Sequence, residues 1–182
     1  MGISGSLRSG SAATTLLEIV AALSPSDVEF KIYGGLEGIP PFNDSREIPD
    51  PVQSFIKQIE DSDGVFICTP EYAYGVPGVL KNALDWTVST TALYDKPVAI
   101  ITAATSGEKA HASLLLTLTA LSTKISAATS LLIPVVRSKL NENNELKDPQ
   151  TFIEINTVFN TFITNLKAEK RAMPSGETTR HG

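Results

Sequence analysis

Short apolar runs that alternate with helical patterns most restrict how this chain can fold. Val28–Tyr33 alternates polar with apolar residues and suits a strand near a sheet edge, whereas Gly2–Ser4 matches only the last residues of a further strand. Three other runs show no alternation, as in strands that are covered on both faces. These runs are Val65–Cys68, Val98–Ile101 and Leu131–Val136. We therefore expect five strands, of which the first is truncated.

Apolar residues at helical spacing follow each of these strands. The helical sets are Leu16, Val20 and Leu23; Val52, Phe55, Ile56 and Ile59; Val79, Leu80, Ala83, Leu84 and Trp86; Leu114, Leu115, Leu118 and Leu121; and Phe152, Ile155, Phe159, Phe162 and Leu166. This alternation predicts an α/β domain with a doubly wound, five-stranded parallel sheet and helices on both faces. We assign residues 1–167 to the domain and the polar residues 168–182 to a C-terminal tail.

Composition excludes several classes of protein. The formal net charge of −5 makes a basic nucleic-acid surface improbable. One cysteine rules out a disulfide framework and a metal site built from cysteines, and it suits a reducing compartment. No apolar stretch approaches the ~20 residues that cross a bilayer. The N-terminal residues lack a basic segment followed by a long apolar run, so we do not expect secretion. We expect a cytoplasmic protein without a membrane span or a metal.

Three loops are expected to carry the chemistry. In an open, doubly wound sheet, ligands bind at the carboxyl ends of the strands, where the strand order reverses. The loops that follow the first, third and fourth strands meet there. They are Ser4–Ala13, Thr69–Gly78 and Ala103–Lys109.

The first loop has the parts of a phosphate site. Gly5 and Gly10 let the backbone turn, Ser6 and Ser11 offer hydroxyls, and Arg8 supplies positive charge next to a helix N-terminus. The loop matches neither the spacing of the dinucleotide-binding glycines nor the phosphate loop of nucleotide hydrolases. A serine-rich helix cap with a solvated arginine is the alternative interpretation.

The second loop is stiff and aromatic, with two tyrosines, two prolines and two glycines among ten residues. It suits a flat ring held by backbone groups, although it could also simply pack on its neighbours. The third loop is small and polar, which is a weak signal. Near these loops, we expect Cys68 to be a buried structural residue and His111 to lie at the surface or in an interface.

These loops resemble the NADPH-dependent FMN reductase family, the flavodoxin-like reductases of quinones, chromate and azo dyes. The matching segments are Gly2–Ser11 and Thr69–Trp86, and the resemblance extends from Gly2 to Leu166. It implies FMN as cofactor and NADPH (or NADH) as the donor of a hydride to flavin N5. The acceptor would be a small molecule: a quinone, a flavin, an azo compound or a metal oxyanion. It also implies a homodimer, with a tetramer possible.

The resemblance assigns residues by position. It implies that the FMN phosphate is bound by Ser6, Arg8, Ser11, Ala12 and Ala13. It implies that the isoalloxazine ring is bound by Pro70, Glu71, Tyr72, Ala73 and Tyr74. The third loop adds Ala104, Thr105, Ser106 and Gly107. We assign no catalytic side chain, because the cofactor carries the reactivity and the protein orients it.

The sequence departs from the family at three places. Members usually have several more residues before Gly2, so we expect the start of this chain to be incomplete. Ala13 and Ala73 stand where the family often has Asn. Gly107–His111 lacks the glycine-rich or arginine-containing stretch that in some relatives contacts a second dimer. Two alternatives remain: an FMN electron carrier that does not oxidise NADPH directly, and an inactive, truncated homologue.

Overall fold

The computed structural model describes residues 1–172 and contains a five-stranded sheet in the order β2-β1-β3-β4-β5. Every neighbouring pair of strands is parallel. The strands are β1 (Gly2–Ser4), β2 (Ile32–Tyr33), β3 (Val65–Thr69), β4 (Val98–Ala103) and β5 (Ser130–Ile133). This order confirms the predicted doubly wound sheet. The order reverses between β1 and β3, and β1 is central although it is short.

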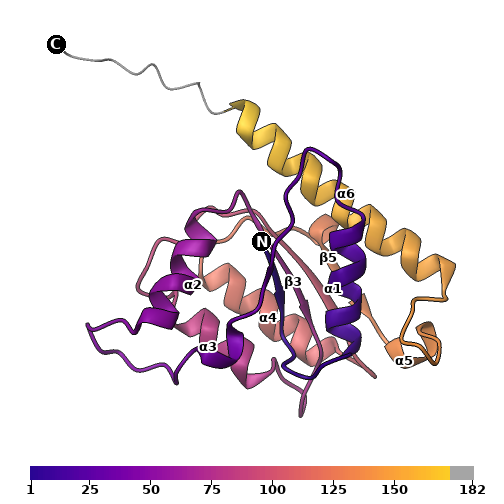
Figure 1. The fold of residues 1–182 in the computed structure, drawn as a ribbon, viewed down its shortest axis with the longest axis horizontal. Coiled ribbons are helices and arrows are strands. Elements are labelled where there is room, and N and C mark those ends of the chain that lie inside the picture. The colour runs from indigo at the N-terminus through magenta and orange to yellow at the C-terminus, as the bar shows by residue number, and fades with distance from the viewer. Residues whose placement is uncertain (173–182) are drawn as a thin grey trace.

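Helices cover both faces of the sheet (Figure 1). The α-helices are α1 (Ala12–Ala22), α2 (Asp50–Glu60), α3 (Gly78–Asp85), α4 (Glu108–Ala120), α5 (Val136–Lys139) and α6 (Pro149–Ala172). Two short 3₁₀ turns, η1 (Leu36–Gly38) and η2 (Ala127–Thr129), precede α2 and β5. Within residues 1–172, no helix has the length and apolar character to cross a bilayer.

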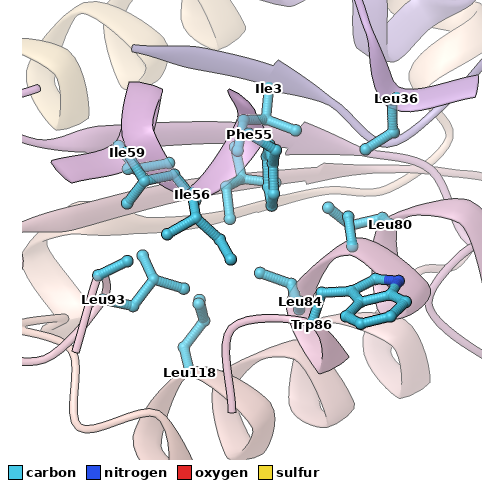
Figure 2. Packing of buried hydrophobic residues seen from close by; sticks show 14 of the residues in the cluster. Ile3, Leu36, Phe55, Ile56, Ile59, Leu80, Leu84, Trp86, Leu93 and Leu118 are labelled. Atoms are coloured by element: carbon cyan, nitrogen blue, oxygen red, sulfur yellow. The ribbon is translucent and has the colours of Figure 1, made fainter. Parts of the chain in front are cut away.

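The apolar core is divided by the sheet into two clusters. Successive strand residues point to opposite faces, so Phe66 packs with α1 and α6, while Ile67 packs with α2, α3 and α4. Figure 2 shows the second cluster, in which Phe55, Leu84 and Leu118 come from three different helices. Because β3 and β4 are buried on both faces, their sequences show no alternation.

Two strands are shorter than the sequence predicts. β2 contains only Ile32–Tyr33 rather than Val28–Tyr33, because its neighbour β1 begins at Gly2. β5 ends at Ile133 rather than Val136. Pro134 has no N–H for a ladder, and Val135 takes the left-handed conformation with φ of 50°. Val136 then begins α5.

The final helix is longer than the sequence predicts. We placed the tail at residues 168–182, but α6 continues through Ala172. The last turns contain good helix formers, and two ion pairs hold them: Lys124 with Glu169 at 3.2 Å and Lys170 with Asp63 at 2.7 Å. Residues 173–182 lie outside the described part of the chain. Phe152, predicted on the apolar face of this helix, is 43% exposed.

Candidate functional site

The first two predicted loops meet at the carboxyl edge of the sheet. The N–H of Gly5 donates to the Cys68 carbonyl at 2.7 Å, which joins the end of β1 to the end of β3. A Cβ on Gly5 would collide with the side chain of Thr69. The two loops can therefore approach this closely only because residue 5 has no side chain.

The N-terminus of α1 has amides free for an anion. Ser11 caps the helix, and its hydroxyl accepts from the Thr14 N–H at 3.1 Å. Among the described residues, the N–H groups of Ala12 and Ala13 have no partner, and the first turn contains no acidic residue. The side chain of Arg8 is exposed and has no ion-pair partner in residues 1–172. These groups fit the charge and geometry of a phosphomonoester.

The second loop contains a tight, strained turn. Tyr72 and Gly75 exchange two backbone hydrogen bonds, of 3.0 and 2.9 Å, across Ala73 and Tyr74. Both central residues are left-handed, with φ of 49° for Ala73 and 61° for Tyr74. This conformation normally requires Gly or Asn. Tyr74 is also 78% exposed, so a strained turn holds an aromatic ring in solvent.

The strain at Ala73 gives a stability prediction. Ala73→Gly should increase the free energy of unfolding by about 1 kcal/mol, because glycine has no Cβ penalty at positive φ. Urea denaturation of the flavin-free protein measures the change. Ala12→Gly, in the first turn of α1, serves as the control and should not stabilise the chain. Equal or lower stability of Ala73→Gly would show that this turn is not strained.

Glu71 connects the second loop to the third. Its carboxylate accepts from the Ser106 hydroxyl at 3.1 Å, the Gly107 N–H at 3.2 Å and the Ala110 N–H at 2.9 Å. Gly107 precedes α4 with φ of 95° and has no side chain to cap the helix, so Glu71 serves as the cap. These hydrogen bonds hold the pKa of Glu71 below its usual value, and the bond from the Ala110 N–H contributes most. The side chain of Glu71, which we predicted to lie at the flavin ring, thus caps the N-terminus of α4.

Tyr72 connects the first and second loops. Its hydroxyl lies 3.2 Å from the hydroxyl of Ser6, which also accepts from the Arg8 N–H at 3.3 Å. The third loop is fixed by the residues after β5, because Val135 and Val136 donate to the carbonyls of Thr105 and Ala104 at 3.1 Å each. The backbone and side-chain contacts between loops thus fix the relative positions of all three.

Two further residues lie close to this edge: His111 near the start of α4 and Cys68 near the end of β3. We expected His111 at the surface or in an interface, but it is partly buried and contacts Thr102 of β4 and Ser130 of β5, at 2.9 Å from each hydroxyl. Burial lowers the pKa of His111, which favours the neutral ring. Cys68 is fully buried as predicted, and burial raises the pKa of its thiol, so the reactive thiolate is disfavoured.

Asn144 could not be identified as a site residue from the sequence. It lies between α5 and α6, yet its amide Nδ2 donates to the Gly10 carbonyl at 2.6 Å. A contact across 134 residues leaves no local pattern; the available signal is a run of turn-forming residues, Asn141–Asn144.

The sequence pattern of one family, NADPH-dependent FMN reductase, matches residues 1–135. The chain belongs to this family. The match contains β1, β3 and β4 and the three loops that follow them, and it confirms the resemblance that the sequence indicated.

Known relatives of this FMN reductase family member are reductases. The NADH:(hydroxy)cinnamate reductase subunit CrdA of Vibrio ruber is 30% identical over 156 residues, covering 81% of this chain and 77% of the relative. A quinone reductase of Escherichia coli is 36% identical over 99 residues, covering 52% of this chain and 51% of that protein. The chain thus aligns with about half the length of this quinone reductase.

The fold has solved counterparts among flavoenzymes. FerB, an NAD(P)H:(acceptor) oxidoreductase from Paracoccus denitrificans, superposes with a TM-score of 0.79 over 92% of this chain and 96% of its own. At 24% identity, this likeness concerns the fold alone.

Every residue that we predicted to bind FMN lies either on the three loops at the carboxyl edge of the sheet or in the first turn of α1. These are Ser6, Arg8, Ser11, Ala12, Ala13, Pro70, Glu71, Tyr72, Ala73, Tyr74, Ala104, Thr105, Ser106 and Gly107. A separate cavity of about 800 Å³ lies near Met1, Phe30, Gly64 and Leu166. It is at the opposite edge of the sheet, where the strands begin. It is lined by none of the predicted residues.

Proposed function

We propose that this chain binds FMN across the three loops and acts as an NAD(P)H-dependent oxidoreductase. One observation supports the proposal: a helix N-terminus with free amides and a strained aromatic turn are joined where the strand order reverses. When bound, FMN supplies the hydride chemistry between NAD(P)H and a small acceptor, such as a quinone, a flavin, an azo compound or a metal oxyanion.

In this proposal, the first loop binds the phosphate. A phosphomonoester carries about −1.5 to −2 charges at pH 7. The Arg8 guanidinium would match about one of these charges, and the amides of Ala12 and Ala13, at the positive end of the α1 dipole, would donate to the oxygens. The hydroxyl of Ser6 can turn toward the same group, since it is bonded to Tyr72 rather than to a charged residue. The hydroxyl of Ser11 caps α1 beside the phosphate site.

The second and third loops would hold the ring. The turn at Tyr72–Gly75 is fixed by its paired hydrogen bonds, and Glu71 keeps it against Ala104–Gly107. A planar ring bound by backbone groups keeps one face accessible to a nicotinamide and an acceptor in turn. We further propose a homodimer in the cytoplasm, because the family resemblance implies a dimer and the single cysteine suits a reducing compartment.

Anaerobic reduction tests the proposed activity. When NADPH is added to the protein reconstituted with FMN, the absorbance of oxidised flavin should disappear faster than with free FMN at equal concentration. Parallel addition of NADH gives the donor preference. A bound flavin that stays oxidised would contradict the reductase and favour an electron carrier. Failure to retain FMN would favour an inactive homologue.

A further inference from the structure

A compact turn between α5 and α6 contacts the first loop. We call residues Leu140–Leu146 the tab, since its two end residues pair as an isolated antiparallel bridge. Asn141 organises it: its side-chain oxygen accepts from the N–H groups of Asn143 at 3.0 Å and Glu145 at 2.8 Å. The Asn141 N–H also donates to the Glu145 carbonyl at 2.9 Å. The tab is therefore a fixed support rather than a loose loop.

Asn144 is the residue of the tab that reaches the candidate phosphate site. Its Nδ2 donates to the carbonyl of Gly10 at 2.6 Å and lies 3.1 Å from the hydroxyl of Thr15. Asn144 has φ of 67°, a left-handed conformation that Asn tolerates better than most residues. Its backbone strain and its side-chain contact thus occur together at the point where the tab meets α1.

This contact fixes the peptide group that leads into α1. The oxygen of the Gly10–Ser11 peptide is bonded to Asn144, and its N–H donates to the Arg8 carbonyl at 3.2 Å. A rotation of this peptide would break both bonds. It could also turn a carbonyl oxygen toward the free amides of Ala12 and Ala13, where it would repel an anion.

We infer that Asn144 is a positioning residue for the phosphate of FMN. It holds the Gly10–Ser11 peptide in the orientation that leaves the N-terminus of α1 open, without touching the phosphate itself. The inference rests on the proposed function, because it takes FMN as the ligand. Its effect should depend on the phosphate, which riboflavin lacks.

Asn144→Gly is the variant of choice. Glycine removes the amide and adopts the positive φ without strain, whereas alanine would also disturb the tab. Asn143→Gly is the matched control: it makes the same replacement one residue earlier, and the Asn143 side chain has no hydrogen-bond partner within residues 1–172. Both variants are compared with the wild type as full chains.

Flavin titration is the first measurement. Asn144→Gly should raise the Kd for FMN roughly three- to tenfold, the size expected for one hydrogen bond. Its Kd for riboflavin should not change, and Asn143→Gly should leave both constants unchanged. An unchanged Kd for FMN, or equal losses for FMN and riboflavin, would overturn the inference. A wild-type chain that binds neither flavin would overturn the proposed function and, with it, the phosphate role.

Amide exchange in the flavin-free chain gives a second readout that does not depend on FMN. Without Asn144, the Ser11 N–H should lose protection, because the peptide is then held at one end only. Exchange of the same amide should be unaffected in Asn143→Gly. Unchanged exchange in Asn144→Gly would overturn the positioning role even if the wild type binds FMN.

Discussion

Replacing Arg8 with Ala is expected to raise the Kd for FMN by about ten- to a hundredfold while the chain remains folded. In the proposed site, the change removes a charge-assisted hydrogen bond from Arg8 to the phosphate, which is typically stronger than a neutral one. The side chain is exposed and lies outside both apolar clusters, so its loss leaves the core intact. Titration by flavin fluorescence at low salt measures the change, since salt screens an exposed charge.

Two comparisons separate a phosphate contact from a general loss of positive charge. Arg171→Ala removes the same charge from the last turn of α6, beside the cavity at the amino edge of the sheet, and should leave FMN affinity unchanged. Riboflavin should bind Arg8→Ala as well as it binds the wild type. Unaltered FMN affinity in Arg8→Ala would mean that the phosphate lies elsewhere.

Glu71→Ala should weaken both the fold and the flavin site. It leaves the N-terminus of α4 without a cap, which typically costs about 0.5–2 kcal/mol in the free energy of unfolding. It also releases the turn at Tyr72–Gly75 from Ser106 and Gly107, so FMN affinity should fall severalfold. Denaturant unfolding and flavin titration measure the two effects. Glu108→Gln, in the exposed first turn of α4, is the control and should change FMN affinity little.

The effect of Glu71 should depend on pH. Its pKa is lower in the folded chain than the usual 4.5, so the ionised form is the one that folding favours. The stabilisation is fully present above 4.5 and is lost as the pH falls through the folded pKa. The stability difference between wild type and Glu71→Gln should therefore shrink in acid below pH 4.5. A difference that stays constant down to the folded pKa would contradict a role for the ionised carboxylate.

The sheet could be predicted from the sequence because its signals are local. β3 and β4 are buried on both faces, and five of the α-helices carry apolar residues at helical spacing. The ends of elements were less predictable. β2 is limited by the length of its neighbour and β5 by Pro134 and Val135, while the last turns of α6 combine good helix formers with ion pairs to distant residues such as Asp63. The neighbour of β2 and the ion-pair partner of α6 lie outside the segments concerned, whereas Pro134 and Val135 lie within the predicted strand Leu131–Val136.

The same distinction applies to the candidate site. Arg8 and Tyr74 stand out in their own loops, and their loops are joined at the expected edge. The parts played by Glu71, His111 and Asn144 depend on partners 35, 19 and 134 residues away. Such contacts exist only after the chain has folded, so no local pattern predicts them.

The close approach at Gly5 has a consequence for protein engineering. Because a side chain at this position would collide with Thr69, the first loop and the end of β3 form one unit rather than two exchangeable parts. Transplanting the Ser4–Ala13 segment into another sheet of this type would succeed only if the recipient had equal room at the position of Thr69. A library that randomises position 5 should return glycine almost alone, while Leu7, which is half exposed, should accept many residues.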